Sequence, residues 1–210
     1  MIKGLVTALI VAIWTLPALA AQEDGLRPSQ LIAAARGQVG VMTGYDPSYV
    51  ALAFPGGDVA PDTGVCTDVV IRAMRDGWHV DLQLAVNRDM KADFAAYPAL
   101  WGLTRTDRNI DHRRVANLVT LLTRLGASQP VDDTEPTPFL PGDLVAWKLP
   151  GNLAHIGIVS DRRSTDGARP LILHNIGHGA QEEDILLTYT ITGHFRVDAG
   201  VASQLRALGT

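Results

Sequence analysis

The cysteine at position 66 is the residue whose chemistry most needs an explanation, because it is the only cysteine among 210 residues. An intrachain disulfide and a zinc site built from several cysteines are therefore excluded. One interpretation is a buried, inert thiol, since free cysteines are often buried. The other is a nucleophile, because Cys66 follows Gly64 and Val65 and opens a run with helical periodicity. In the first turn of a helix, free N–H groups and the helix dipole favour a thiolate and can hold an oxyanion.

A nucleophilic thiol needs a general base, and the base needs a group that orients it. Two histidines are well placed in the sequence, since His155 begins the strand-like run HIGIVS and His174 ends the strand-like run LILH. If these runs are neighbouring antiparallel strands, both imidazoles lie side by side near one edge of the sheet. A helix packed on that sheet could bring Cys66 to the same place. For each histidine, a surface position or a structural hydrogen bond is the alternative.

The spacing of His174 and His178 could indicate a metal site. However, the intervening residues Asn-Ile-Gly do not favour a helix that would put both rings on one face. The sequence also lacks an H-E-x-x-H motif. We therefore expect no metal and no cofactor.

The elements that must position these residues are helical in the first part of the chain and β-rich in the second. Caps and periodicity predict four helices, at residues 29–40, 65–76, 82–96 and 111–126. Runs between Gly and Pro signals predict four strands, at residues 144–149, 155–160, 170–176 and 194–197. This order predicts an α+β domain in which the N-terminal helices pack on a C-terminal antiparallel sheet. The tail, 198–210, is expected to be loose or weakly helical.

The first 20 residues have the features of a secretory signal peptide: Lys3, an apolar stretch, and the cleavage pattern Ala18-Leu19-Ala20. The apolar stretch is shorter than the roughly 20 residues of a spanning helix, although an N-terminal anchor remains the alternative. We expect cleavage near Ala20, no membrane span in the mature protein, and a periplasmic or secreted location in a bacterium. Residues 21–210 are expected to form a single domain.

Composition excludes some other classes of protein. Hydrophobic residues make up 47% of the chain, which is enough for a core, and the net charge is −4. No basic run stands out, which argues against a nucleic-acid-binding protein. A Gly- and Pro-rich loop at 41–63 is long enough to suggest a functional role, and a Pro- and acid-rich connector follows at 127–142. We expect no catalytic role for two further sets of residues. Glu182, Glu183 and Asp184 are expected in a solvated turn. Trp78, Trp101 and Trp147 are expected in the core or in the wall of a cleft.

Several short motifs occur in a characteristic order: GVCTDVV, PGDLVAWKL, AHIGIVSD and PLILHNIG. This order resembles that of the NlpC-type papain-like cell-wall cysteine peptidases. The resemblance is closer to a branch of that superfamily known only as a domain of unknown function. It extends over nearly the whole mature chain, through motifs such as FPGGDVAPDTGVCTDVVIRA, NIDHRRVANL and ITGHFR.

The resemblance implies a papain-like fold and a Cys-His-His triad. Cys66 would be the nucleophile, His155 the general base and His174 the group that orients it, with Asn175 as a competing candidate for the third role. The implied activity is that of an exported cysteine amidohydrolase, a peptidase or amidase that acts on peptidoglycan stem peptides. Acyl transfer of this kind needs no metal. The scissile bond and the oligomeric state stay open.

The group that helps to bind the oxyanion is a point of departure from the family pattern. The family often has a tyrosine about a dozen residues before the cysteine, and Phe54 holds that position here. Tyr45 or Tyr49 could replace it. Further candidates for oxyanion or substrate binding are Asp68, Asp111, Arg113 and Arg114. Arginine binds carboxylates bidentately, whereas capping and surface charge are the structural alternatives.

Two other functions remain open for this sequence. One is a non-catalytic cell-wall peptide or glycan binding protein on the same scaffold, and the other is a secreted amidase toxin. A binding protein does not need the thiol of Cys66, so the substitution Cys66→Ala separates it from an enzyme.

Overall fold

The computed structural model describes residues 26–131 and 137–210, which form an α+β fold around a six-stranded antiparallel sheet. The described α-helices are α1 (Pro28–Arg36), α2 (Cys66–Trp78), α3 (Leu82–Ala92), α4 (Val115–Arg124) and α5 (Ala199–Gly209). Short 3-10 helices are η1 (Phe94–Ala96), η2 (Asp111–Arg113) and η3 (Pro150–Asn152). The strands are β1 (Ser128–Gln129), β2 (Leu144–Leu149), β3 (Leu153–Arg163), β4 (Pro170–Asn175), β5 (Ala180–Glu183) and β6 (Thr190–Phe195). Their order in the sheet is β1-β6-β2-β3-β4-β5.

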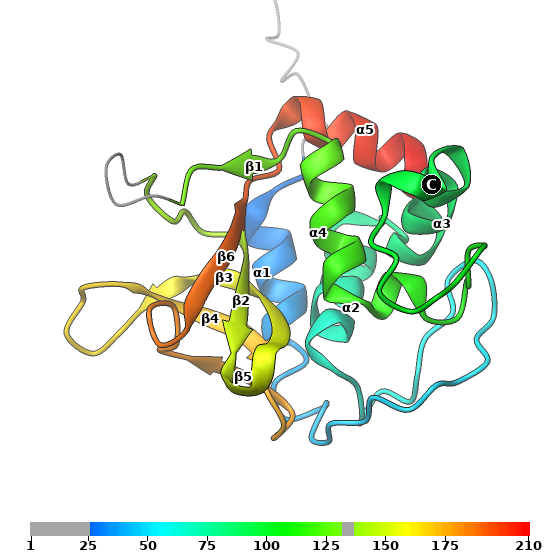
Figure 1. Ribbon diagram of the computed structural model, residues 1–210. Coiled ribbons are helices and arrows are strands. Elements are labelled where there is room, and N and C mark those ends of the chain that lie inside the picture. The colour runs from blue at the N-terminus through cyan, green and yellow to red at the C-terminus, as the bar shows by residue number, and fades with distance from the viewer. Residues whose placement is uncertain (1–25, 132–136) are drawn as a thin grey trace, which may run out of the picture.

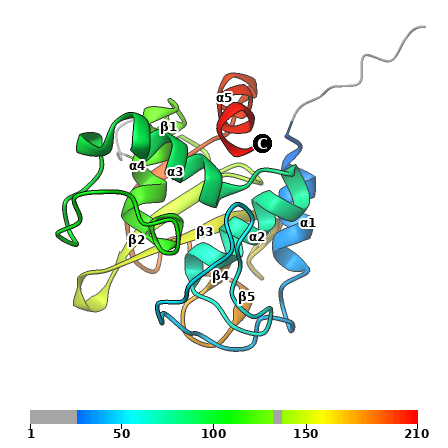
Figure 2. The ribbon, with the colours of Figure 1, turned by 90° about the vertical axis from the view of Figure 1, so that its right-hand side faces the viewer.

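Helices α1 and α2 cover one face of the sheet, where both contact β3 and β4. In α2, the apolar residues Val69, Val70, Ala73 and Met74 follow a helical period and are buried. On the far side of α2 lies α3, which also contacts α4 and α5. In Figure 1 the sheet lies to the left and the helices to the right, and Figure 2 shows the long α1–α2 loop running below the helices. The start of α2 therefore lies at the boundary between helices and sheet.

The sheet is buried on both faces around β2, and the alternation of its residues shows this directly. Leu144 and Ala146 belong to the core that includes the helices, whereas Val145 and Trp147 belong to a second apolar cluster. The Trp147 indole Nε1 donates to the carbonyl of Leu186 at 3.0 Å, which fixes the segment that covers this second face. β2 therefore lies between two apolar clusters, paired with β3 on one side and with β6 on the other.

The predicted order of helices before an antiparallel sheet is confirmed, with differences at individual elements. The helix predicted from residue 111 begins later, because 111–113 form η2 and Arg114 is extended before α4. The tail was expected to be loose or weakly helical, and it forms the regular helix α5. Its start is capped by the Asp198 side chain, which accepts the N–H of Val201 at 2.9 Å, and its apolar face is buried.

Strand β5 is the main element that the sequence did not predict. The expectation of a solvated turn at the acidic run was wrong for Glu182 and Glu183, which lie in β5. The backbone turns back at the glycine-containing segment before Ala180 and pairs with β4, which needs no apolar side chains. Glu182 pairs with Leu173 and Glu183 with Ile172, so the two carboxylates lie on opposite faces of the sheet.

The expected signal peptide at 1–20 lies outside the described residues, as do residues 132–136 of the expected connector. None of the helices within 26–131 and 137–210 has the combination of length and apolar character that a bilayer span requires.

Candidate active site

Cys66 is the first residue of α2, and only 4% of its surface is exposed. The side chain of Asp68 caps this helix start, because its Oδ2 accepts the N–H of Val65 at 2.7 Å. The sulfur accepts a hydrogen bond from the backbone N–H of Ile156, the residue that follows His155 on β3. This contact joins the predicted nucleophile to the strand of the predicted base.

Among the described residues, no hydrogen bond joins the thiol to a histidine ring. The side chain of His155 lies beside Trp147 on the face of the second apolar cluster, with ring centroids 5.8 Å apart, whereas Cys66 and Ile156 belong to the core on the helix side. His155 is also not among the residues that line the cleft at Cys66.

The thiol of Cys66 is protonated at neutral pH. Burial raises its pKa to about 11, and the negative charge of Asp68 adds to this. The N–H groups of Ile156 and Thr67 lower the pKa but do not offset the burial. The expectation of a thiolate at this helix start was therefore wrong for the resting protein, since loss of hydration outweighs the helix-start donors. For this sulfur to act as a nucleophile, its proton would have to pass to a nearby base.

The rings of His155 and His174 meet on neighbouring antiparallel strands. Nε2 of His155 lies 3.0 Å from Nδ1 of His174, and the two rings are nearly perpendicular, at 85°. Nε2 of His174 in turn lies 3.0 Å from Oε2 of Glu183 on β5. Three strands thus contribute one residue each to a continuous line of hydrogen-bonded side chains.

This line determines which nitrogen of each ring carries the proton. Burial lowers the pKa of both histidines, to about 3 for His155, so both rings are neutral at pH 7. A carboxylate can only accept, so Nε2–H of His174 donates to Glu183. Nδ1 of His174 must then accept from Nε2–H of His155. Nδ1 of His155 is left without a proton, which is the form that a general base needs.

Gly157 makes room for the His174 ring. A Cβ atom at position 157 would lie 2.7 Å from Cγ2 of Ile172 and 3.1 Å from Cβ of His174. Any side chain at this point of β3 would therefore push β4 away. The H-x-G pattern at 155–157 thus has a steric explanation. His155 supplies one imidazole, and Gly157 leaves the space that the imidazole of His174 needs to approach it.

Asn175 has a different set of contacts from those of an orienting residue. Its Nδ2 donates to the carbonyls of Gly44 and Gly64, each at 3.1 Å, and its Oδ1 accepts the N–H of Gly177 at 3.0 Å. It is His174, not Asn175, that contacts His155. Asn175 instead ties the end of β4 to the loop that leads into Cys66.

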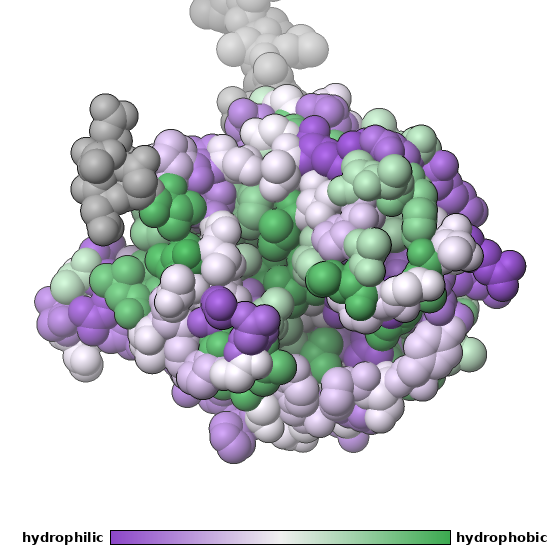
Figure 3. Space-filling model, in the orientation of Figure 1, coloured by the Kyte–Doolittle hydropathy of each residue, from purple (hydrophilic) through white to green (hydrophobic). Residues whose placement is uncertain are grey.

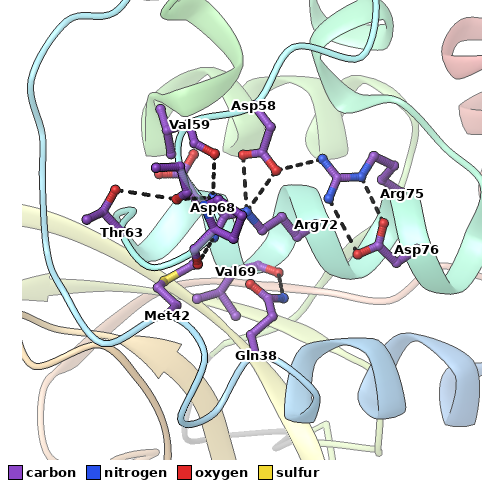
Figure 4. A network of polar contacts seen from close by, with 12 residues as sticks. Gln38, Met42, Asp58, Val59, Thr63, Asp68, Val69, Arg72, Arg75 and Asp76 are labelled. Atoms are coloured by element: carbon purple, nitrogen blue, oxygen red, sulfur yellow. Dashed lines mark hydrogen bonds and ion pairs between the residues drawn. The ribbon is translucent and has the colours of Figure 1, made fainter.

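The long loop before α2 is held against that helix by arginine side chains, as Figure 4 shows. Arg72 is buried; its Nε donates to the Asp58 carboxylate at 2.9 Å, and its other nitrogens donate to loop carbonyls at 59–61. Arg75 contacts the same carboxylate at 2.8 Å. The loop therefore presents its residues to Cys66 from a fixed position.

A cleft of about 250 Å³ opens beside Cys66. Figure 3 shows that this face of the molecule is hollowed between sheet and helices, with hydrophobic surface gathered in the hollow. Tyr45 lines the cleft together with Cys66, and burial, followed by the neighbouring Cys66, raises the pKa of its phenol. The hydroxyl is therefore a proton donor at neutral pH, as an oxyanion partner must be.

The other aromatic candidates lie elsewhere. Tyr49 contacts Asp107 and Asn109, with its hydroxyl 3.1 Å from Oδ2 of Asp107, and it lines a separate pocket that also contains Phe54. Neither Tyr49 nor Phe54 is among the residues that line the cleft at Cys66. Of the two tyrosines considered as replacements for the missing hydroxyl, the structure brings only Tyr45 to the thiol.

The charged candidates are engaged within the protein. Arg113 and Asp68 form a buried ion pair, with Nη2 and Oδ2 at 2.9 Å, and Arg113 also donates to the carbonyls of Asp46 and Ser48. This pair joins the start of α2 to η2 and to the loop at Tyr45. Arg114 pairs with buried Asp111 at 3.1 Å and stacks on Trp101 at 3.9 Å. We assign Asp68 and Arg113 to the support of the site, since neither offers its charge to a ligand.

A model of the family described as a domain of unknown function, DUF1287, matches residues 32–197, which contain every residue of the site described above. The chain belongs to the DUF1287 family. The Escherichia coli (strain K12) protein named "Uncharacterized protein YijF" is 52% identical to it over 162 residues, which cover 77% of this chain and 78% of that protein.

In this DUF1287 chain, two residues at the site, Glu183 and Leu100, were not identified from the sequence. Glu183 was assigned to a solvated turn. In β5, however, Gln181 pairs with His174, and Glu183 lies two residues further along, so its side chain is diagonal to His174 on the same face of the sheet. Leu100 carried no chemical signal at all, yet it lines the cleft. The prediction of core or cleft-wall positions holds for all three tryptophans, since Trp101 lines the cleft and Trp78 and Trp147 are buried.

Proposed function

We propose that this protein is a cysteine amidohydrolase of the NlpC-type papain-like superfamily. The observation that carries the proposal is the contact between the Cys66 sulfur and the N–H of Ile156, directly after His155. The line from His155 through His174 to Glu183 supports it, because it leaves the base in the required protonation state. The order of motifs in the sequence supports the superfamily assignment.

The first step is attack on an amide carbonyl. The sulfur of Cys66 bonds to the carbonyl carbon, and the thiol proton passes to Nδ1 of His155, whose ring has to reach the sulfur from its place beside Trp147. The neutral resting pair makes proton transfer part of the attack, since a thiol with a pKa of about 11 has little thiolate at pH 7. The positive charge that forms on His155 is stabilised through His174 by the carboxylate of Glu183.

The charge that develops on the carbonyl oxygen needs donors at the start of α2. The backbone N–H groups of Cys66 and Thr67 lie at the first turn of this helix and contact the sulfur in the resting protein, and we assign them to the developing oxyanion. The Tyr45 hydroxyl, which lines the same cleft, is the side-chain donor that we assign to this role. It takes the place of the tyrosine whose usual position is held by Phe54.

The second step releases both products. His155 gives its proton to the leaving amine as the carbon–nitrogen bond breaks, which leaves a thioester on Cys66. Water then attacks the thioester and gives a carboxylic acid and the free thiol. His155 removes a proton from that water and returns it to the sulfur.

The substrates that we propose are peptides of the bacterial cell wall, reached after export of the protein to the periplasm or exterior. Support for this comes from the sequence: the leader-like residues 1–20 and the resemblance to cell-wall peptidases. Peptidoglycan stem peptides provide amide bonds in that compartment.

The proposal is tested with the protein and two variants, Cys66→Ala and His155→Ala, each incubated with purified muropeptides. Products are identified by mass spectrometry. We expect the unsubstituted protein to cleave an amide bond and both variants to lose this activity. Cleavage that persists in Cys66→Ala would exclude the proposed nucleophile. Binding of muropeptides without cleavage by any of the three proteins would instead support the non-catalytic alternative.

A further inference from the structure

The cleft beside Cys66 has apolar walls that face solvent. Leu100 is 70% exposed and Trp101 is 40% exposed, and both line the cleft. The lining also includes Val115 and Ala154, and Ala154 immediately precedes His155 on β3. Exposed apolar side chains that gather around a concave site mark a surface for binding. The question is which chemical group this surface accepts.

The charges near the cleft argue against an anionic group. Arg113 is the charged side chain of its lining, and its guanidinium already pairs with Asp68 at 2.9 Å. All three of its nitrogens donate to protein acceptors: the Asp68 carboxylate and the carbonyls of Asp46 and Ser48. A carboxylate that entered the cleft would lose water without gaining a counterion, which is unfavourable.

The second nearby arginine is also unavailable. Trp101 lines both the cleft and an adjacent pocket that contains Arg114. The guanidinium of Arg114 stacks on the indole at 3.9 Å and pairs with Asp111 at 3.1 Å. The indole therefore lies between this charge and the cleft, and stacking holds it in place as a wall.

We propose that the cleft formed by Tyr45, Leu100 and Trp101 binds an apolar, uncharged group that the substrate carries next to its scissile amide. This rests on the proposed function, and it narrows the substrate class. A volume of about 250 Å³ holds one side chain or short acyl group rather than a whole ligand. Amides flanked by aliphatic or aromatic groups fit, whereas amides flanked by a free carboxylate do not.

Binding is measured without turnover, on the Cys66→Ala protein. N-acetyl-leucinamide and the α-amide of N-acetylglutamic acid, each in both enantiomers, are titrated and followed by NMR shifts of the protein. We expect a leucinamide to bind about tenfold or more tightly than the glutamate compound. The shifts should centre on Leu100 and Trp101. Equal or tighter binding of the glutamate compound overturns the proposal, and so does failure of both leucinamides to bind.

Two exposed leucines provide a matched pair of variants. Leu100→Asp places a carboxylate at the cleft, whereas Leu187→Asp places one at a position with 68% exposure that is not among the cleft residues. Leu100→Asp should remove most of the preference for the leucinamide, and Leu187→Asp should leave it unchanged. An equal effect of both substitutions would contradict a role for the cleft.

Turnover separates this proposal from the proposed function. The unsubstituted protein is incubated with the same amides and with muropeptides, and amide cleavage is measured. Selective binding of the leucinamide without Cys66-dependent cleavage of any compound leaves the apolar cleft standing and refutes the amidohydrolase. Cys66-dependent cleavage that prefers amides beside a carboxylate supports the amidohydrolase and refutes the apolar cleft.

Discussion

Nε2 of His155 and Nδ1 of His174 lie 3.0 Å apart, and the carboxylate of Glu183 determines the direction of the hydrogen bond between them. With both rings neutral, the line has one arrangement in which every contact is satisfied. That arrangement leaves Nδ1 of His155 free of a proton. The carboxylate of Glu183 contacts His174 and has no hydrogen bond to the thiol.

Glu183 is therefore predicted to be a positioning residue. Glu183→Ala should lower kcat by about tenfold or more with little change in KM, because the base loses its fixed tautomer and the imidazolium loses a stabilising charge. Glu183→Gln should restore much of the loss at neutral pH, since an amide oxygen also accepts from Nε2–H. Asp184→Ala, on the adjacent exposed residue, is the control and should be neutral. An equal loss in the alanine and glutamine variants would contradict a role through the tautomer.

The thiol of Cys66 should react slowly at neutral pH. Because burial raises its pKa to about 11, the thiolate fraction rises with each pH unit above 7 in the folded protein. The rate of alkylation by iodoacetamide should increase continuously from neutral pH to about pH 10. The rate is followed by intact mass, with the urea-unfolded protein as a reference that reacts faster at pH 8. A rate that is already constant below pH 7 would indicate a preformed thiolate–imidazolium pair and contradict this account.

The buried ion pair between Asp68 and Arg113 should be important for stability. Asp68→Ala leaves the Arg113 guanidinium buried without a counterion and should lower the free energy of unfolding by about 3–5 kcal/mol. The exposed pair between Asp184 and Arg169 provides the comparison, and Asp184→Ala should cost less than about 1 kcal/mol. Urea unfolding followed by circular dichroism measures both. Similar losses of unfolding free energy in the two variants would show that the buried pair stabilises the protein no more than the exposed pair does.

His112 should make the protein less stable in mild acid. It is buried with Nδ1 unpartnered, and burial lowers its pKa to about 4 from an unfolded value near 6.5. Between these values the unfolded chain binds a proton that the folded chain does not, so stability falls as pH drops from about 6.5 to about 4. The loss from this residue is on the order of 3 kcal/mol.

The substitution His112→Gln removes this titration. Its unfolding free energy should depend less steeply on pH than that of the unsubstituted protein, although His155 and His174 contribute in the same direction. Urea midpoints at about pH 7.5 and about pH 5 give the comparison. If the unfolding free energy of both proteins depends identically on pH, His112 does not cause the loss of stability in acid.

The sequence predicted the parts of the site that have strong local signals. The run 144–149 alternates between the two apolar clusters and is a strand with those same bounds. Cys66 at the start of a helix and the two histidines on adjacent strands followed from similar local patterns. These elements could be predicted because their periodicity is set by burial of one or both faces.

Other features depend on contacts distant in the sequence and carried no local signal. The thiol pKa reflects how deeply α2 packs against β3, which outweighs the helix-start effect that a local reading emphasises. Glu183 acquires its contact only when β5 folds back beside β4, and an acidic run by itself indicates exposure. Arg113 was considered a candidate for carboxylate binding, and its engagement with Asp68 could be seen only in three dimensions.

In the mechanism that we propose, Cys66 carries the acyl group during amide cleavage. The most direct measurement is acid quenching of the protein within the first turnovers on muropeptides and N-acyl amides, followed by intact-mass and peptide analysis. We expect an adduct on the peptide that contains Cys66, with the mass of the substrate less its amine, and no adduct in Cys66→Ala. Amide cleavage at an undiminished rate in Cys66→Ala would contradict this mechanism.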